Sequence, residues 1–536
     1  MSIAAVPPAR ARRKKGAKGV MIVSGRMRET LQGLVAIAAS LALWELLGSA
    51  TGWGRAVMPA PSRILAQAWA DRALYALHGL ATIETSALGF MIGVAIAVPA
   101  AIGFCRYPAL ERVFRGVNIT LFAMPGIVLG PLLVLFLKGD WPQIVLAAIL
   151  VYFPVMSATL LGLNGLDPRI RDLVAAYGGG AGALMRHARL RGALPALCAG
   201  LRAAAPLAVL GAMLGEFGSG TRRGLGAFLL AALPQGNPPR LWGIGLAASA
   251  IALAGFILFL LPARGLAASS TDVTPAAEAH VAAAPESAGR RIALALTAIA
   301  LPFAIWWLGV TLSHVSPIIA PGPGRTLMLF IAGKEAAAAR AALGSALAQT
   351  VPTALAGLFV GLAVAFALAA LSLLAPMLSR MLAPFALIAQ TMPLVAVLPF
   401  VVVVFGRGTT ASLFTAVLVV FFPAYVLLQQ GFTTVPRAAN DLVSAYGGGR
   451  WTRLVHVAVP SSLGHLFAAT RLIAPQALLG VMVAEWLITG SGLGNLLNIS
   501  RAGLDYDMIW AGAFVSILIS VAAHEAVGIV ERKVRG

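Results

Sequence analysis

The sequence predicts an all-α membrane protein with about twelve transmembrane helices, arranged as a parallel duplication of six and six. Three observations predict this fold class. Hydrophobic residues make up 59% of the 536 residues and charged residues only 11%, whereas soluble domains carry about 25% charged residues. Long apolar runs recur, and a run of about 20 apolar residues crosses the bilayer as a helix. The second half of the chain also repeats the first.

The apolar runs define the expected spans. The alternating pattern of barrel strands is absent, and helices satisfy their own backbone hydrogen bonds in lipid. The spans predicted in the first half are 31–49, 83–104, 118–137, 142–163, 197–215 and 241–262. The spans predicted in the second half are 292–312, 350–374, 383–404, 411–430, 466–485 and 508–529.

The positive charge predicts which side each loop faces. We attribute the net charge of +21 to cytoplasmic loops rather than to nucleic-acid binding, because such loops collect Lys and Arg. With the N-terminus in the cytoplasm, 28 of the 40 Lys and Arg residues fall on the cytoplasmic side. Six spans per half then make the repeat parallel and place both termini in the cytoplasm. Loops 164–196 and 431–465 are expected inside, and loops 216–240 and 486–507 outside.

Composition divides the chain into four segments. A basic cytoplasmic tail covers 1–29, and six-span domains cover 30–262 and 291–536. Between the domains lies a cytoplasmic linker, 263–290, which is rich in Ala, Ser, Thr and Pro and is expected to be flexible. The two cysteines, Cys105 and Cys198, fall near predicted cytoplasmic helix ends and are expected to be reduced thiols. No spacing typical of a metal site is present, and no cofactor is expected.

The loop between the fourth and fifth spans carries the strongest repeat. Residues 172–180 and 441–449 are identical at eight of nine positions and end in three glycines. In the first half Asp167 can cap a helix and Pro168 can occupy its first turn. The glycines should end this helix, because they tolerate positive φ, and a second helix carrying His187 then leads into span five. We expect an L-shaped element and a docking surface in each half.

These residues resemble the cytoplasmic "EAA" loop of binding-protein-dependent ABC importer permeases. In that loop an acidic residue is followed by Gly and then by Pro, at the spacing of Asp441, Gly447 and Pro460. The sulfonate/nitrate/taurine group is the most similar. Its members begin a domain with Leu-Trp-x-Leu and Pro-x-Pro-Ser, here at 43–46 and 59–62. They also carry Gly-Leu-Gly after a Glu, here at 224–226 and 492–494.

The resemblance implies two permease domains fused in one chain of a bacterial inner membrane. It implies as partners two ABC ATPase subunits, a periplasmic substrate-binding protein, the lipid bilayer and a small-molecule substrate, such as a sulfonate-, nitrate- or taurine-like anion. ATP hydrolysis is expected on the separate ATPase, because this chain has no GxxxxGK[ST] loop, and the chain is expected not to be an enzyme. The residues implied in ATPase docking are Asp172, Ala176, Tyr177, Gly178, Asp441, Ala445, Tyr446, Gly447 and Pro460.

A Met-Pro step falls inside the predicted third span of each half. Proline kinks a helix and frees a carbonyl group, so the step either breaks a helix that lines the pathway or bends a helix for packing. Both interpretations remain open from the sequence. The candidate pathway residues are Met124, Pro125, Gln390, Thr391, Met392 and Pro393.

The two predicted docking loops differ at one position. Pro460 of the second loop should stop its second helix before span five, because proline lacks an N–H donor. The first loop has Arg191 there, so its helix is expected to continue one turn to Pro195.

Two other functions fit the composition. A secondary carrier of the major-facilitator type also has two parallel six-helix halves, but residues 105–112 do not match its signature between spans two and three. A membrane scaffold without transport activity would give no reason for duplicated cytoplasmic helices that end in glycines.

Overall fold

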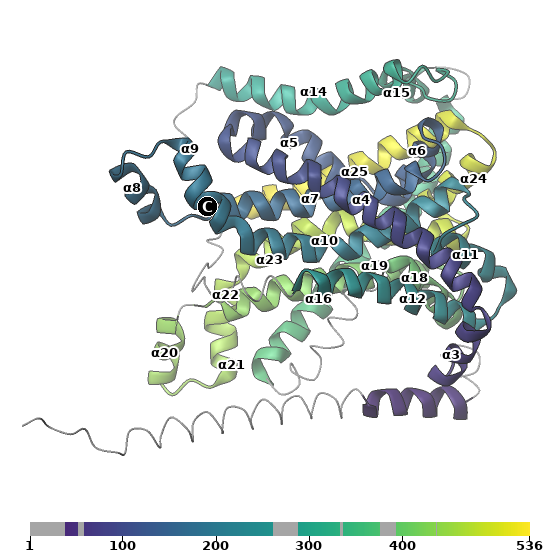
Figure 1. Cartoon of the computed structure of the whole chain (residues 1–536), viewed down its shortest axis with the longest axis horizontal. Helices are drawn as coiled ribbons and strands as arrows, with labels where there is room; N and C mark the ends of the chain where they lie inside the picture. Colours follow the sequence, from purple (N-terminus) through teal and green to yellow (C-terminus); the bar gives the residue numbers. More distant parts are fainter. Residues whose placement is uncertain are drawn as a thin grey trace, which may run out of the picture.

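The computed structural model describes residues 38–51, 58–260, 288–332, 336–375, 393–435 and 437–535, which form a helical bundle (Figure 1). The first half contains a helix over Ala38–Ala50, then α3 (Pro61–Ala70), α4 (Arg72–Arg106), α5 (Pro108–Ala123), α6 (Gly126–Phe136), α7 (Trp141–Asn164), α8 (Pro168–Ala176), α9 (Ala181–Leu184), a π-helix (Met185–Arg189), α10 (Leu190–Ser219), α11 (Leu225–Ala232), a 3₁₀ turn (Leu233–Gln235) and α12 (Pro238–Leu258).

The second half repeats this order. It contains α14 (Ala288–Leu312), α15 (Pro323–Ile331), α16 (Ala336–Leu374), α18 (Leu394–Phe405), α19 (Thr409–Thr433), α20 (Arg437–Ala445), α21 (Arg450–Arg453), a π-helix (Leu454–Ala458), α22 (Val459–Ser461), α23 (Leu463–Ala484), a π-helix (Glu485–Thr489), α24 (Gly492–Ala502) and α25 (Tyr506–Arg535). The predicted tail 1–29 and almost all of the linker 263–290 lie outside the described residues.

The all-helical membrane fold is confirmed, but the count of twelve spans is not. Within the described residues, nine helices are long and apolar enough to cross a membrane, or ten if α5 and α6 together form one span. The predicted span 31–49 is described from residue 38 onward and belongs to a short helix. The predicted span 383–404 begins outside the described residues, and α18 represents its second part.

The predicted third span, 118–137, is interrupted at its Met-Pro step, where the sequence predicted a break or a bend. The chain leaves α5 at Met124 and enters α6 at Pro125, and both residues have extended backbone. The residue before a proline avoids the helical region, and proline itself offers no N–H to the preceding turn. As a result, α5 and α6 meet at an angle of 103°.

Small residues hold the central three helices of each half together. In the first half α7 lies between α4 and α10. A Cβ on Gly89 of α4 would lie only 2.5 Å from the Cβ of Ala147 on α7. A Cβ on Gly211 of α10 would lie only 2.6 Å from the Cα of the same alanine. Close backbone approach through small residues is the usual packing of membrane helices. The second half repeats this contact between α16, α19 and α23 with Gly357, Ala416 and Gly480.

The two halves interlock through their outer helices. The first helix of the second half, α14, packs along α5 of the first half, and α25 packs against α5 and α6 (Figure 1). In turn, the last helix of the first half, α12, packs against α18 of the second half. An aromatic pair lies at each of these two contacts between the halves. The rings of Trp242 and Phe400 lie 3.7 Å apart, and those of Trp510 and Phe136 lie 6.1 Å apart.

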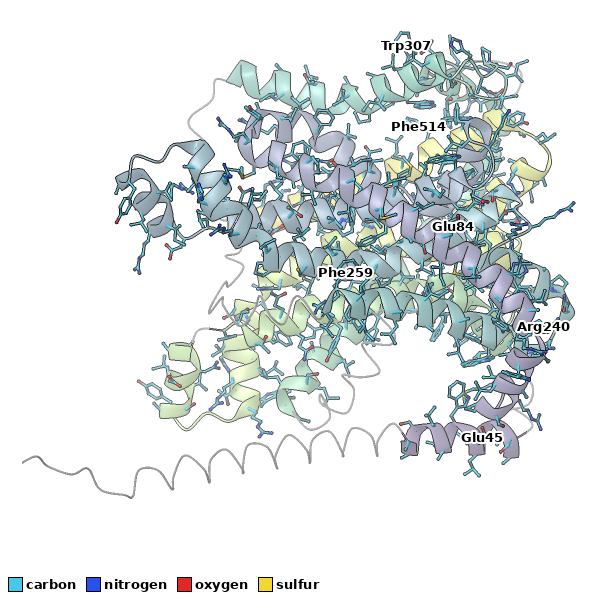
Figure 2. The ribbon with its side chains drawn as sticks, in the orientation of Figure 1. Glu45, Glu84, Arg240, Phe259, Trp307 and Phe514 are labelled. Carbon is cyan, nitrogen blue, oxygen red and sulfur yellow. The ribbon has the colours of Figure 1, made fainter. Side chains whose placement is uncertain are left out.

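The bundle has two distinct ends. Helices α8, α9, α20 and α21 gather at one end, whereas α3, α11, α15 and α24 lie at the other (Figure 1). Arg240 and Glu45 also lie at the α11–α24 end (Figure 2). The structure thus groups loops 164–196 and 431–465 on one side and loops 216–240 and 486–507 on the other. Which end faces the cytoplasm stays a prediction.

Candidate functional site

The first predicted docking element, which we call the first docking element, comprises residues 168–189, and its two arms form the expected L (Figure 1). The side chain of Asp167 caps α8 by accepting a hydrogen bond from the backbone N–H of Arg169 at 2.9 Å. The helix ends at Tyr177, and Gly178 follows with φ +75°. Glycine adopts this conformation without the steric penalty of a Cβ. The next arm begins at Ala181 and continues through the π-helix into α10.

The second docking element, residues 437–458, has the same backbone. Gly447 has φ +74°, and the N–H of Gly448 donates to the carbonyl oxygen of Val443 at 2.8 Å. The first element contains the matching bond, from Gly179 to Val174, at the same length. Each second arm also passes through a five-residue π-helix at the same place. The repeated glycines therefore produce a repeated geometry.

Both elements are exposed: the first presents Tyr177 outward, and the second presents Tyr446 and Trp451. The side chains of Tyr177 and Tyr446 are each 86% exposed. All nine residues implied in docking are exposed at the α8–α20 end: Asp172, Ala176, Tyr177, Gly178, Asp441, Ala445, Tyr446, Gly447 and Pro460.

Side-chain bonds brace the second element. Arg453 donates from Nη2 to Oγ of Ser444 at 2.6 Å, which joins its two arms. Arg450 donates from Nη1 to the carbonyl oxygen of Leu374 at 3.0 Å, which ties the element to the end of α16. The first element has Leu184 and Ala181 in place of these arginines. Because neither side chain can donate a hydrogen bond, the first element lacks both braces.

The two second arms also differ where Pro460 was expected to act. After Pro460 the helix is interrupted at Ser462 before α23 begins, so the predicted stop is confirmed. In the first half α10 runs through Pro195 without a break, so the stop expected there is wrong. A single missing N–H within a long helix is tolerated where neighbouring helices support it, and α10 packs along α7.

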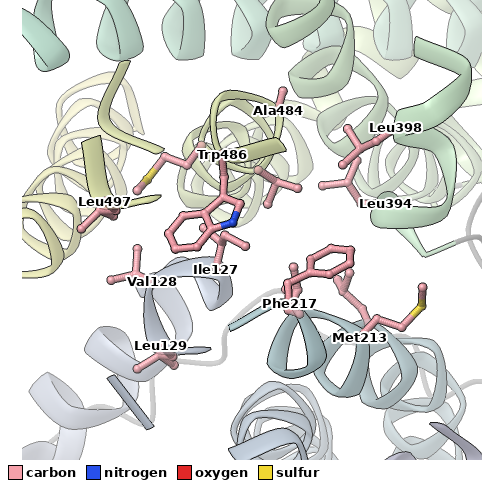
Figure 3. Close-up of a cluster of buried hydrophobic side chains, with 14 of the residues drawn as sticks. Ile127, Val128, Leu129, Met213, Phe217, Leu394, Leu398, Ala484, Trp486 and Leu497 are labelled. Carbon is pink, nitrogen blue, oxygen red and sulfur yellow. The ribbon is translucent and has the colours of Figure 1, made fainter. Parts of the chain in front are cut away.

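Buried apolar residues of both halves meet between α6 and α18, and we call this cluster the apolar closure (Figure 3). The first half contributes Ile127, Val128, Leu129, Met213 and Phe217, and the second contributes Leu394, Leu398, Ala484, Trp486 and Leu497. Met124 and Pro125 directly precede α6, and Pro393 directly precedes α18; both helices contribute residues to the closure. The other pathway candidates, Gln390, Thr391 and Met392, lie outside the described residues.

Sequence reasoning missed a buried carboxylate in each half. Glu216 is 2% exposed at the end of α10. Its carboxylate accepts hydrogen bonds from the hydroxyl of Thr82 on α4 at 2.7 Å and from the backbone N–H of Gly226 on α11 at 2.5 Å. The Thr82 hydroxyl in turn accepts the N–H of Leu225 at 2.8 Å. We call this group the first Glu-Thr clasp, and it joins three helices.

The second Glu-Thr clasp repeats the first. Thr350 of α16 donates to Glu485 at 2.8 Å and accepts the N–H of Leu493, while Gly494 donates to the same carboxylate at 2.9 Å. Glu485 is 4% exposed. Both carboxylates satisfy amides at the start of a helix, where the helix dipole favours negative charge.

The clasps explain the repeated Gly-Leu-Gly. A Cβ on Gly224 would lie 2.2 Å from Cδ of Glu216, and a Cβ on Gly492 would lie equally close to Cδ of Glu485. Both glycines also have positive φ. A signal for the threonines was present, because Thr-x-x-Thr begins at residues 82 and 350, in the same register as Gly-Leu-Gly.

Comparison with known proteins identifies the family. Residues 89–268 and again residues 357–536 match the family described as "Binding-protein-dependent transport system inner membrane component". The chain belongs to this family. It is a multi-pass inner membrane protein with two permease domains in one chain, as the resemblance indicated, and it is a transport component as predicted. The match favours neither the scaffold nor the major-facilitator alternative.

Individual relatives in this family are distant and differ in substrate. The riboflavin transport system permease protein of Chloroflexus aurantiacus is 31% identical over 155 residues, which are 29% of this chain and 58% of that protein. The taurine transport system permease protein of Escherichia coli is 25% identical over 236 residues, or 43% and 84% of the two chains. The nitrate import permease protein of Synechococcus elongatus is 23% identical over 145 residues, or 26% and 52%. The matches span less than two thirds of the riboflavin and nitrate permeases.

Proposed function

We propose that this chain is the permease subunit of an ATP-driven ABC importer and forms the translocation pathway for a small solute. One observation carries the proposal: two exposed L-shaped elements of the same backbone geometry lie at one end of the bundle. Two copies of one docking geometry fit two copies of one partner. We infer that this partner is an ABC ATPase, that it hydrolyses ATP on its own chain, and that the α8–α20 end faces the cytoplasm.

The remaining assignments follow from this orientation. The α11–α24 end faces a periplasmic substrate-binding protein, both termini are cytoplasmic, and the domains are 30–262 and 291–536. The Met-Pro steps at 124–125 and 392–393, with Gln390 and Thr391, border the pathway. ATPase closure would swing the two halves between inward-open and outward-open states, which is rigid-body alternating access. The apolar closure would seal the pathway at the α11–α24 end.

The substrate we propose is a small anion, such as a sulfonate, nitrate or taurine. The taurine and nitrate relatives named above support this class, whereas the riboflavin relative does not. The other candidate function is an ion-coupled secondary transporter with six and six helices.

Reconstitution distinguishes the importer from the secondary transporter. We expect uptake into liposomes only when the cognate ATPase, the binding protein and ATP are all present. Substrate accumulation driven by a proton or sodium gradient, without any ATPase, would favour the secondary transporter.

A second experiment tests the docking elements. Replacing Tyr177 and Tyr446 together with Ala should weaken ATPase binding at least about tenfold, because exposed tyrosines often dominate an interface. Trp69 of α3 is the matched control, since it is 72% exposed at the opposite end. Trp69→Ala should leave ATPase binding unchanged. Equal effects of the two replacements would contradict the docking assignment.

A further inference from the structure

Arg501 is a half-buried cation that has no partner among the residues that the structure describes. It lies at the end of α24, and within the described part of the chain its guanidinium makes no hydrogen bond or ion pair. Burial lowers the pKa of this guanidinium. The acidic residues that follow it in sequence are already engaged. Asp505 accepts the N–H of Met508 at 3.0 Å, and Asp507 pairs with Arg325 at 2.8 Å. A guanidinium with unpaired N–H donors that is partly shielded from water can bind an anion through charge-assisted hydrogen bonds.

The guanidinium lies beyond the apolar closure, where the two halves meet. Leu497 is buried in the closure one helical turn before Arg501, on the same face of α24. Asn498 donates to the carbonyl oxygen of Trp486 at 3.3 Å, which fixes α24 against the closure. Between the second half and the first, Nη2 of Arg501 lies 3.9 Å from where a Cβ on Gly220 would stand. Gly220 follows α10 of the first half, three residues after Phe217 of the closure.

Two further cations follow Gly220 in the same loop. Arg222 and Arg223 are both exposed there. The second half has no charge in its matching loop, which reads Gly490-Ser491, and the first half has Leu233 at the position that matches Arg501. The positive group is therefore single rather than duplicated, although each half contributes to it.

We propose that Arg501, together with Arg222 and Arg223, forms a binding site for a small oxyanion at the mouth of the closed pathway. A guanidinium presents paired N–H donors that match a sulfonate, sulfate or carboxylate group. Apart from Nη2 of Arg501, no other described atom outside the adjacent residues lies within 4 Å of where a Cβ on Gly220 would stand, so no side chain covers the guanidinium from this side. The step from a bound anion to a transported one rests on the proposed function, and the site itself does not.

Thiol labelling beside Arg501 tests the site. Ala502 is exposed, and Cys105 and Cys198 are buried, so Ala502→Cys provides one accessible thiol and the parent chain gives the background. The rates of a negatively charged and a positively charged methanethiosulfonate reagent are compared in detergent. Arg501→Gln should lower the ratio of the anionic to the cationic rate about fivefold, as expected for loss of one charge at close range. Arg325→Gln, at the same end of the bundle, should leave the ratio unchanged.

Sulfate then distinguishes a binding site from a merely positive surface. Screening by salt slows the anionic reagent and speeds the cationic one, whereas an occupying anion shields the thiol from both. We expect millimolar sulfate to slow both reagents more than chloride of equal ionic strength. Arg501→Gln should abolish this protection, and Arg501→Lys should keep the rate ratio but weaken the protection.

Two results would overturn the proposal: sulfate acting like chloride, or protection that survives Arg501→Gln. The labelling needs no ATPase and no binding protein. Its outcome is therefore separate from the reconstitution that tests the importer function. A chain that binds sulfate but supports no ATP-driven uptake would contradict the importer while leaving the anion site in place.

Discussion

The first and second docking elements share one backbone and differ in how that backbone is held. Gly178 and Gly447 have φ values of +75° and +74°, and both tyrosines before them are equally exposed. In the second element Arg453 joins the two arms and Arg450 ties them to α16, whereas the first element is tied to α4 by Arg189, which donates from Nη1 to Sγ of Cys105 at 3.0 Å, and no bond equivalent to that of Arg453 joins its arms. The same contrast applies at the opposite end, where the clasps are duplicated and the arginine site is not.

The duplicated features are those that only one type of residue can provide, whereas the single-copy features can be replaced by other residues. A positive φ favours glycine, and a carboxylate buried against backbone amides leaves unpaired groups when it is removed. The side chains of the arm-joining brace and of the arginine group meet neither requirement, and the two copies differ there. We infer that the duplicated devices serve folding and docking common to both halves, while the single-copy features give each half its own role.

The largest expected effect comes from the clasps. Glu485→Ala and Glu216→Ala each leave two buried donors without an acceptor, the threonine O–H and a glycine N–H, at about 1–3 kcal/mol for each group. Both variants should lose most of their folded protein in detergent, measured by size-exclusion yield and thermal unfolding. Thr350→Val should be milder, because the carboxylate keeps its bond to Gly494.

Glu84 provides the control for the clasp variants. It is exposed on α4, two residues from Thr82, so Glu84→Ala should leave the yield unchanged. If the two clasp variants fold as well as Glu84→Ala, the clasps have no structural role. A large loss in only one half would mean that the clasps are not equivalent.

Much of the docking end was predictable from the sequence, whereas the clasps were not. The glycine triplets, Asp167 and Pro460 act on the backbone within a few residues, so local rules sufficed. Thr82 and Glu216 meet across 134 residues, and only tertiary packing brings them together. The Met-Pro step predicted a break, but the angle of 103° depends on how α6 packs against α10. For the same reason the packing of α14 on the other half left no sequence signal.

The next effect compares the two docking glycines. A Cβ on Gly178 or Gly447 would have no atom within 4 Å, so Trp fits each isolated chain at an equal strain of about 1–2 kcal/mol. A docked partner would instead meet a bulky ring. We expect Gly447→Trp to lose more ATPase binding and uptake than Gly178→Trp, because Arg453 joins the two arms of the second element and keeps them from moving aside. Equal losses would end the proposed asymmetry without affecting the permease assignment.

A smaller effect is expected from removing one brace. Arg453→Leu gives the second element the residue that the first has at Leu184, and it removes the bond to Ser444. A hydrogen bond of this kind is worth about 1 kcal/mol, which corresponds to a several-fold weaker ATPase affinity. The reverse change, Leu184→Arg beside Ala175→Ser, should strengthen the first element. An unchanged affinity in both variants would show that the braces do not affect docking.

The smallest effect concerns the ion pairs at the α11–α24 end. Arg240 binds Asp71 through two bonds of 2.7 and 2.8 Å, whereas Arg325 and Asp507 form one exposed pair. The hydrogen bond from Arg240 holds the pKa of Asp71 below its usual value. A lowered carboxyl pKa stabilises the fold above the unfolded value of about 4, and this stability disappears as pH falls through the folded pKa.

Asp71→Asn should therefore lower Tm at pH 7, and the difference in Tm between this variant and the parent chain should shrink toward pH 3. Asp507→Asn should change stability by less than about 1 kcal/mol, because exposed pairs contribute little. A gap for Asp71→Asn that persists unchanged to pH 3 would mean that packing, and not the charge of Asp71, stabilises this junction.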